Sequence, residues 1–160
     1  MNNINANELS AKLTSGEVKA NQVKVAEAAS LELTSGNVNL SSIEADEITM
    51  KLQSGDVKIE DMHADVKANL TSGNFKVNGL SGEATIRVKS GDIHLVQDTA
   101  DNLDIETISG NINVVAASDF AGFFDAQAVS GNVRTPDSLR TGTELIKIRA
   151  TSGNINITQP

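Results

Sequence analysis

The stretch "LTSGNVNL" at residues 33–40 decides the fold, because close variants of it recur along the whole chain. Related segments are "LTSGEVKA" at 13–20, "LQSGDVKI" at 52–59, "LTSGNFKV" at 70–77 and "ATSGNINI" at 150–157. Eight Ser-Gly pairs in one register follow one another at spacings of 18 to 22 residues. A repeat with a period near 20 residues is typical of a solenoid, in which similar units stack on one another.

Apolar and polar side chains alternate on both sides of each Ser-Gly pair. The third residue after the serine is apolar in all eight copies, and the fifth is apolar in all except Thr135. The residue between these two is polar in every copy, and the sixth and fourth residues before the serine are again apolar. A period of two indicates a strand with one buried face. Each repeat therefore predicts a strand, a Ser-Gly turn and a second strand.

No helical pattern interrupts these repeats. The sequence predicts an all-β fold, a single-stranded parallel β-helix (β-solenoid) of about eight coils of 18–22 residues, forming a single domain over residues 1–160. Parallel strands of neighbouring coils would lie about 4.8 Å apart. Each coil would bury its apolar face only against its neighbours, so no coil would be stable alone.

The turn residues have a physical reason to recur. Glycine allows a corner with positive φ, the small serine can bond to the turn backbone, and Asn or Asp suits a tight turn and can bond from coil to coil. We therefore assign structural turn roles to fifteen residues: Gly16, Gly36, Gly55, Gly73, Gly91, Gly110, Gly131, Gly153, Asn37, Asp56, Asn74, Asp92, Asn111, Asn132 and Asn154.

Composition restricts the function classes. The net charge is −8 and no run of Lys and Arg is present, so nucleic acid is not an expected partner. The chain contains no cysteine, so it has neither a disulfide framework nor a thiol nucleophile. Phosphate loops, dinucleotide fingerprints and Gly-x-Ser-x-Gly elbows are missing from the sequence. We therefore predict a non-enzyme, with no catalytic, cofactor-binding or metal-binding residues and no cofactor.

Two groups of acidic residues are candidate sites. Asp56 and Asp92 lie two coils apart, about 10 Å along the stack, which is too far to share one calcium ion. Asp61, His63 and Asp65 alternate along one strand, which suggests a metal site, but a single histidine between acids is more typical of a solvated surface. We interpret the first pair as turn residues and the second group as solvent-exposed.

Two insertions lengthen the last coils. Residues 117–127 contain three of the four phenylalanines, and residues 135–145 contain Pro136. Phe124 occupies a core position of the repeat, whereas Phe120 and Phe123 could fold over the solenoid as a lid. The C-terminal "SGNINITQP" is expected to leave its coil exposed at the end of the stack. That end would be covered by chain outside these residues, by a second copy, or by the 135–145 insertion.

The eight Ser-Gly-Asp/Asn-Val/Ile coils resemble a bacterial adhesin-like family of unknown function, whose members are β-solenoids of degenerate repeats. The resemblance covers residues 8–158. It implies a non-catalytic structural or adhesive module of the bacterial cell envelope that displays a rigid β-solenoid surface to a partner. Two alternatives stay open: a polysaccharide-binding or polysaccharide-cleaving β-helix protein, and a sensor or scaffold domain of an envelope-stress protein.

The sequence gives only broad expectations about the binding partner and the cellular compartment. The partner could be a protein or a cell-surface glycan, and the solenoid ends could join copies into a homo-oligomer. No apolar stretch is long enough for direct membrane insertion. Residues 1–5 are polar and do not match a signal peptide, so the sequence leaves the localisation open.

Overall fold

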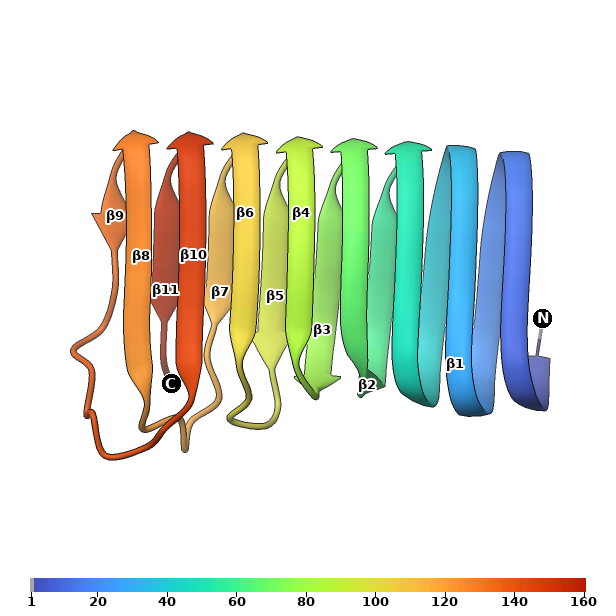
Figure 1. Cartoon of the computed structure of the whole chain (residues 1–160), viewed down its shortest axis with the longest axis horizontal. Helices are drawn as coiled ribbons and strands as arrows, with labels where there is room; N and C mark the ends of the chain where they lie inside the picture. Colours follow the sequence, from blue (N-terminus) through green and yellow to red (C-terminus); the bar gives the residue numbers. More distant parts are fainter. Residues whose placement is uncertain (1) are drawn as a thin grey trace.

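The computed structural model describes residues 2–160 as a β-solenoid in which the chain winds through two faces of parallel strands (Figure 1). We call the two faces the front sheet and the back sheet, as they lie in Figure 1. The strands are β1 Asn2–Ser54, β2 Val57–Ser72, β3 Phe75–Ser81, β4 Ala84–Ser90, β5 Ile93–Gln97, β6 Leu103–Ser109, β7 Ile112–Val115, β8 Phe123–Ser130, β9 Val133–Arg134, β10 Leu145–Ser152 and β11 Ile155–Thr158.

The predicted all-β parallel solenoid is confirmed, with about six turns rather than eight. The difference arises at the start of the chain. Residues 2–54 form one continuous strand that winds around the solenoid before the separate strands begin, so the first coils are not divided into registered strands of their own. All eight Ser-Gly pairs nevertheless lie at corners with positive φ at the glycine.

The core consists of aliphatic columns that run along the stack. On the back sheet, Val57 pairs with Phe75, which pairs with Ile93, and the column continues through Ile112 and Ile155. All five side chains are at least 99% buried. Burying one such side chain contributes about 1.5–3 kcal/mol, so in-register repetition of apolar positions stabilises the stack.

The last coil does not lie at the end of the stack. In the front sheet β10 pairs with β6 on one side and with β8 on the other, and in the back sheet β11 lies between β7 and β9. Figure 1 shows the red strands β10 and β11 inserted between yellow and orange ones. The expectation that the C-terminal segment forms the exposed end is therefore wrong. The outermost coil is the one formed by β8 and β9.

Two loops make this insertion possible. The segment 135–144 leaves β9, passes the lower end of the strands in Figure 1 and enters β10. It is fastened by the N–H groups of Thr141 and Gly142, which both donate to the Ala121 carbonyl. The segment 116–122 connects β7 to β8, and the Gln159 amide donates to its Phe120 carbonyl at 2.7 Å.

The early coils share a second corner, opposite the Ser-Gly turn, with the same backbone geometry. Its central residue adopts a left-handed conformation, with φ near +54° at Ser42 and Asp61 and +78° at Gly79. Asn3 and Gln22 occupy the same corner in the first coils. The residue type varies from coil to coil, so the sequence repeat did not reveal this corner. Left-handed Asn, Asp and Gly are common, whereas Gln and Ser are less usual there.

Candidate functional site

The Ser-Gly turns form one continuous column. The eight glycines have φ between +128° and +145°, a region that side chains rarely adopt. A Cβ added to Gly91 would lie 1.9 Å from the carbonyl oxygen of Gly73 in the neighbouring coil. Glycine is thus required both by the backbone conformation and by the close approach of the next coil. The stacking order is Gly16, Gly36, Gly55, Gly73, Gly91, Gly110, Gly153 and Gly131.

The Asn and Asp residues after these glycines form a hydrogen-bonded ladder. The Oδ1 atom of each side chain accepts the backbone N–H of the equivalent residue in the next coil. Asp56 accepts from Asn74 at 2.9 Å, and Asp92 accepts from Asn111 at 2.7 Å. The remaining N–H donors are Asp56 to Asn37, Asp92 to Asn74, Asn154 to Asn111 and Asn132 to Asn154. In this ladder Asp56 and Asp92 each support the neighbouring coil.

The structure does not bring Asp61, His63 and Asp65 together as a metal site. Asp61 forms the left-handed corner, and Asp65 accepts the N–H of Glu83 at 2.9 Å. His63 is exposed between them, because alternate side chains of this segment point outward and inward. Across residues 2–160, no group of three or more His, Asp and Glu side chains is placed to hold a metal ion.

The phenylalanine cluster packs differently from the expectation. Phe120, in the connecting loop, is 99% buried, whereas Phe124 is only half-buried although it holds the repeat's core position. Their ring centroids are 4.9 Å apart. Phe123 is 42% exposed on the outermost coil. Phe120 therefore covers the core from the loop, as expected of a lid. Phe123 does not cover the core.

A groove of about 650 Å³ runs along the front sheet, and we call it the axial groove. Its walls are two rows of side chains at the third and first positions before each Ser-Gly pair. The row between them is turned into the core, so its backbone forms the floor. The wall residues are Glu32, Lys51, Asn69, Arg87, Glu106, Arg149 and Gln127 on one side, and Thr34, Gln53, Thr71, Lys89, Ile108, Thr151 and Val129 on the other.

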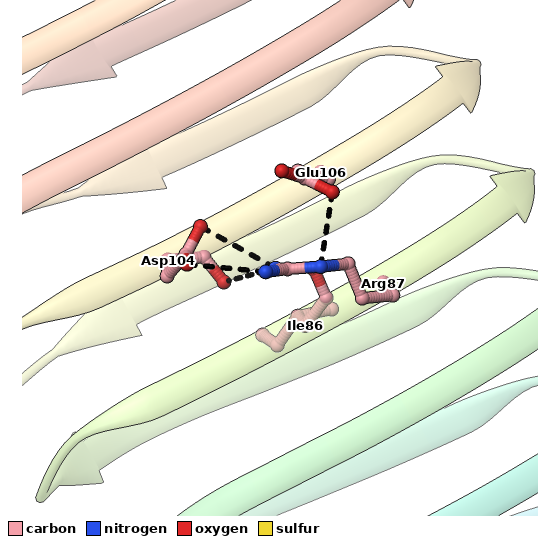
Figure 2. A network of polar contacts seen from close by, with 4 residues as sticks. All are labelled: Ile86, Arg87, Asp104 and Glu106. Atoms are coloured by element: carbon pink, nitrogen blue, oxygen red, sulfur yellow. Dashed lines mark hydrogen bonds and ion pairs between the residues drawn. The ribbon is translucent and has the colours of Figure 1, made fainter.

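One wall of the axial groove contains an ion-pair network (Figure 2). Arg87 on β4 donates from Nη2 to Asp104 Oδ2 at 3.1 Å and lies 3.0 Å, through Nε, from Glu106 Oε2 on β6. Two strands further along, Arg149 on β10 donates from Nη2 to Asp125 Oδ2 on β8 at 2.6 Å. The guanidinium groups also donate to strand carbonyls, so each arginine joins neighbouring coils.

The electrostatics of this wall follow from these contacts. The hydrogen bond from Arg149 holds the pKa of Asp125 below its usual value, and the nearby positive charge acts in the same direction. The bond to Asp125 and the charges of Asp104 and Glu106 raise the pKa of Arg149. Both groups therefore stay ionised near neutral pH. Within residues 2–160, Lys51 and Lys89 make no recorded ion pair.

The axial groove carries more positive than negative charge, although the chain is acidic. Its lining contains four cationic and two anionic side chains, while the net charge of the chain is −8. This groove was not predicted from the sequence. A signal was present, since the first and third positions before each serine are outward-facing and rich in Thr, Lys and Arg. Their proximity becomes visible only once the coils are in register.

Residues 2–160 contain no helix that is long and apolar enough to cross a membrane. A family model described as Toastrack DUF4097 matches residues 2–158, from the first strand to the last. None of the curated proteins matches the chain. No solved structure matches it either.

Proposed function

Because the chain belongs to the Toastrack DUF4097 family, we propose that it is a non-catalytic binding module that presents the axial groove to an extended partner at the bacterial cell envelope. One observation carries this proposal. The groove runs along seven of the eight Ser-Gly repeats without interruption, and each of these repeats contributes wall residues at the same two positions. Such a surface offers equivalent contacts at a regular spacing of about 4.8 Å, which suits a long, linear ligand.

The charge of the axial groove favours an acidic ligand. Lys51 and Lys89 lie on opposite walls, two coils apart, and their ammonium groups are available to an incoming anion. The Thr34, Gln53 and Thr71 side chains on the same stretch of the groove add hydroxyl and amide donors. An extended protein segment or glycan that carries carboxylate or phosphate groups has the complementary chemistry. The net negative charge elsewhere would repel such a ligand, so binding would be confined to the groove.

A catalytic role has less support. Asp56 and Asp92, the two acids that the repeat places in line, each accept the backbone N–H of the next coil. Their carboxylates therefore hold the coils together. A polysaccharide-binding function remains compatible with the axial groove, because an acidic glycan is one form of the proposed ligand.

Titration calorimetry with defined polymers tests the proposal. Polyglutamate and polygalacturonate serve as extended carboxylated probes, and dextran of similar length serves as the neutral probe. We expect both acidic polymers to bind and dextran not to bind. The double variant Lys51→Gln/Lys89→Gln should weaken binding about tenfold or more, since two charge-assisted contacts are lost.

The double variant Lys58→Gln/Lys76→Gln is the matched control. It removes the same charge from the back sheet, where both lysines are exposed. Equal loss of binding in the two double variants would indicate attraction without a site and would contradict the proposal. Binding of dextran as tight as that of the acidic polymers would contradict the acidic specificity alone.

A further inference from the structure

The hydrogen-bond pattern of the Ser-Gly corner has a direction along the stack. In each coil the glycine N–H donates to the serine carbonyl of the next coil, as Gly91 does to Ser109 and Gly153 does to Ser130, both at 2.9 Å. The N–H two residues later donates to the next Asn or Asp carbonyl, as Ile155 does to Asn132 at 2.8 Å. One end of the stack is therefore left with donors and the other with acceptors.

The donor end is the outermost coil of β8 and β9. The N–H groups of Gly131 and Val133, which continue this pattern, have no recorded acceptor within residues 2–160. The Oδ1 atom of Asn132, the last side chain of the ladder, likewise accepts no recorded bond within those residues. The corner half of this coil thus presents two donors and one acceptor at the spacing of the repeat.

The acceptor end is the first coil, around Gly16. By the same pattern, the carbonyls of Ser15 and Glu17 and the N–H of Glu17 point away from the stack. A Cβ at Gly16 would meet only Leu13 Cδ2, at 3.8 Å. At each of the other seven turn glycines the Cβ position lies within 2.0 Å of a neighbouring glycine carbonyl. Gly16 therefore leaves open the space that such a carbonyl occupies everywhere else in the column.

Apolar side chains gather at both ends. Five of the six large hydrophobic residues with high exposure lie in the outermost coil or beside it, namely Phe123, Val129, Val133, Leu139 and Leu145. At the other end, Leu9, Ala11 and Leu13 of the first coil are only partly buried. Val133 occupies a core position of the repeat, and its 39% exposure comes from the missing neighbour on its outer side.

We propose that the outermost coil stacks on the first coil of a second copy of this chain, head to tail, and that the corner hydrogen bonds continue across the junction. The outward N–H groups of Gly131 and Val133 would donate to the Ser15 and Glu17 carbonyls of the next copy. Two outermost coils facing each other would present donors to donors, so the same contact does not form head to head. A heterologous contact of this kind repeats and gives open chains rather than closed dimers.

The 135–144 loop limits the contact to the corner half of the coil. The Phe124 N–H donates to Ser138 Oγ at 3.1 Å, so the loop already occupies the start of the outer edge of β8. In Figure 1 this loop lies at the lower end of the outermost strands, whereas the corner at their upper end is uncovered. The expected junction is therefore small, and association should be weak and dependent on concentration.

Sedimentation velocity over a concentration series tests this arrangement. The wild-type chain of 16.8 kDa should show a weight-average mass that rises with concentration beyond the dimer value. Val133→Lys blocks the donor end with a charge, and Leu13→Lys blocks the acceptor end. Each variant alone should stay monomeric, whereas an equimolar mixture should form dimers only, because one intact end of each kind remains. Ile108→Lys, which adds the same charge to the outer face of an inner coil, should associate like wild type.

Each alternative outcome has a distinct meaning. A wild-type mass that stays at the monomer value up to millimolar concentration overturns the proposal. Association that survives in Leu13→Lys but not in Val133→Lys indicates head-to-head contact and also overturns it. If Val133→Lys does not fold, Val133→Pro removes the outward N–H without adding a charge at this edge position and should likewise abolish association. None of these outcomes bears on polymer binding in the axial groove, which lies on the side of the solenoid.

Discussion

The two halves of the solenoid follow different rules of order. Between residues 38 and 97 each coil stacks directly on the preceding one, and tight corners join the strands. Between residues 103 and 158 the last coil is inserted between two earlier ones, and long loops connect them. Both halves share the same Ser-Gly corner and ladder. The repeat therefore encodes how coils pair, but it does not encode which coils become neighbours.

The inserted coil is the better core element. Ile146, Ile148, Ile155 and Ile157 of β10 and β11 are at least 97% buried. The outermost coil pairs the half-buried Phe124 with Ile146, Ala126 with Ile148 and the exposed Val133 with Ile155. A coil in the middle of the stack buries both sides, and a coil at the end buries one. Placing the large aliphatic residues inside and the small ones at the end therefore removes more apolar surface from water.

Charge favours the same order. Lys147 pairs in register with Asp104 on one side and with Asp125 on the other. If the coils followed chain order, the two aspartates would lie opposite each other, and like charges in adjacent strands are destabilising. The insertion places Lys147 between these two aspartates, where its charge is opposite to both.

Disulfide trapping gives the largest expected difference between the two orders. The chain has no cysteine, so Asp104→Cys/Lys147→Cys introduces a single pair on adjacent strands, about 4.8 Å apart. We expect complete oxidation to an intramolecular disulfide. Asp104→Cys/Asp125→Cys places the thiols two strands apart, about 10 Å, which is too far for a bond. Mass spectrometry after oxidation measures how much of each double variant forms the intramolecular disulfide. Cross-linking only in the second pair would show that the coils follow chain order.

Gly91→Val should produce the largest loss of stability. The Cβ would lie 1.9 Å from the Gly73 carbonyl oxygen, and φ is +141°. We expect a loss of about 3 kcal/mol or more in the free energy of unfolding. Gly16→Val carries the same backbone strain at φ +128° but meets no carbonyl, so its loss should be clearly smaller. Urea denaturation compares them. Equal losses would mean that backbone strain alone explains the glycine column.

Truncation of the core compares the inserted and outermost coils directly. Ile155 and Val133 occupy paired positions, and their exposures are 1% and 39%. Ile155→Ala should cost about 2–5 kcal/mol, because it leaves a cavity inside the stack. Val133→Ala should cost less than about 1 kcal/mol, because the site is open to solvent. Similar costs in denaturant titrations would contradict the assignment of β9 to the open end.

Arg149→Met should have a smaller effect, which depends on pH. The folded-state pKa of Asp125 is lowered by the Arg149 hydrogen bond, so the stabilisation is complete above the usual aspartate range. It is lost as the pH falls through the lowered pKa, where the carboxylate becomes protonated in the folded state. The pair is partly exposed, so we expect less than about 1 kcal/mol at pH 7 and no difference once the Asp125 carboxylate is protonated in the folded state. Lys12→Met, which removes a more exposed pair with Glu32, serves as the control. A difference that grows on acidification would contradict the assigned pair.

The double variant Asp56→Asn/Asp92→Asn should have the smallest effect. Asn37 and Asn74 already accept a backbone N–H from the next coil through Oδ1, so asparagine can make the same bond. The free energy of unfolding should change by no more than a surface substitution changes it, about 0.5 kcal/mol, as measured by urea denaturation. Loss of a calcium-dependent stabilisation, or of glycan cleavage, in this variant would show that the two carboxylates form a site.

Local patterns in the sequence determined the fold class. The alternation around each serine defines strands with one buried face, and the glycine after it defines a corner that a side chain would obstruct. Both features depend only on residues within one coil, so they can be recognised from this single sequence. Asp56 and Asp92 could be interpreted as turn residues for the same reason. The second corner was missed, since Gln22, Ser42 and Asp61 reach the same left-handed conformation without a common residue type.

Only the tertiary structure decided the order of the coils and the composition of the axial groove. Every coil has nearly the same pairing edges, so the local pattern allows many orders with almost equal hydrogen bonding. The choice depends on sums over distant residues: the apolar area that each coil buries and the charges that become neighbours across the stack. Lys147 lies beside Asp104, and the Asn154 N–H donates to Asn111 Oδ1, only in the order observed. The pattern within one coil determines which side chains face outward and can make contacts. The order of the coils determines which of those side chains become neighbours.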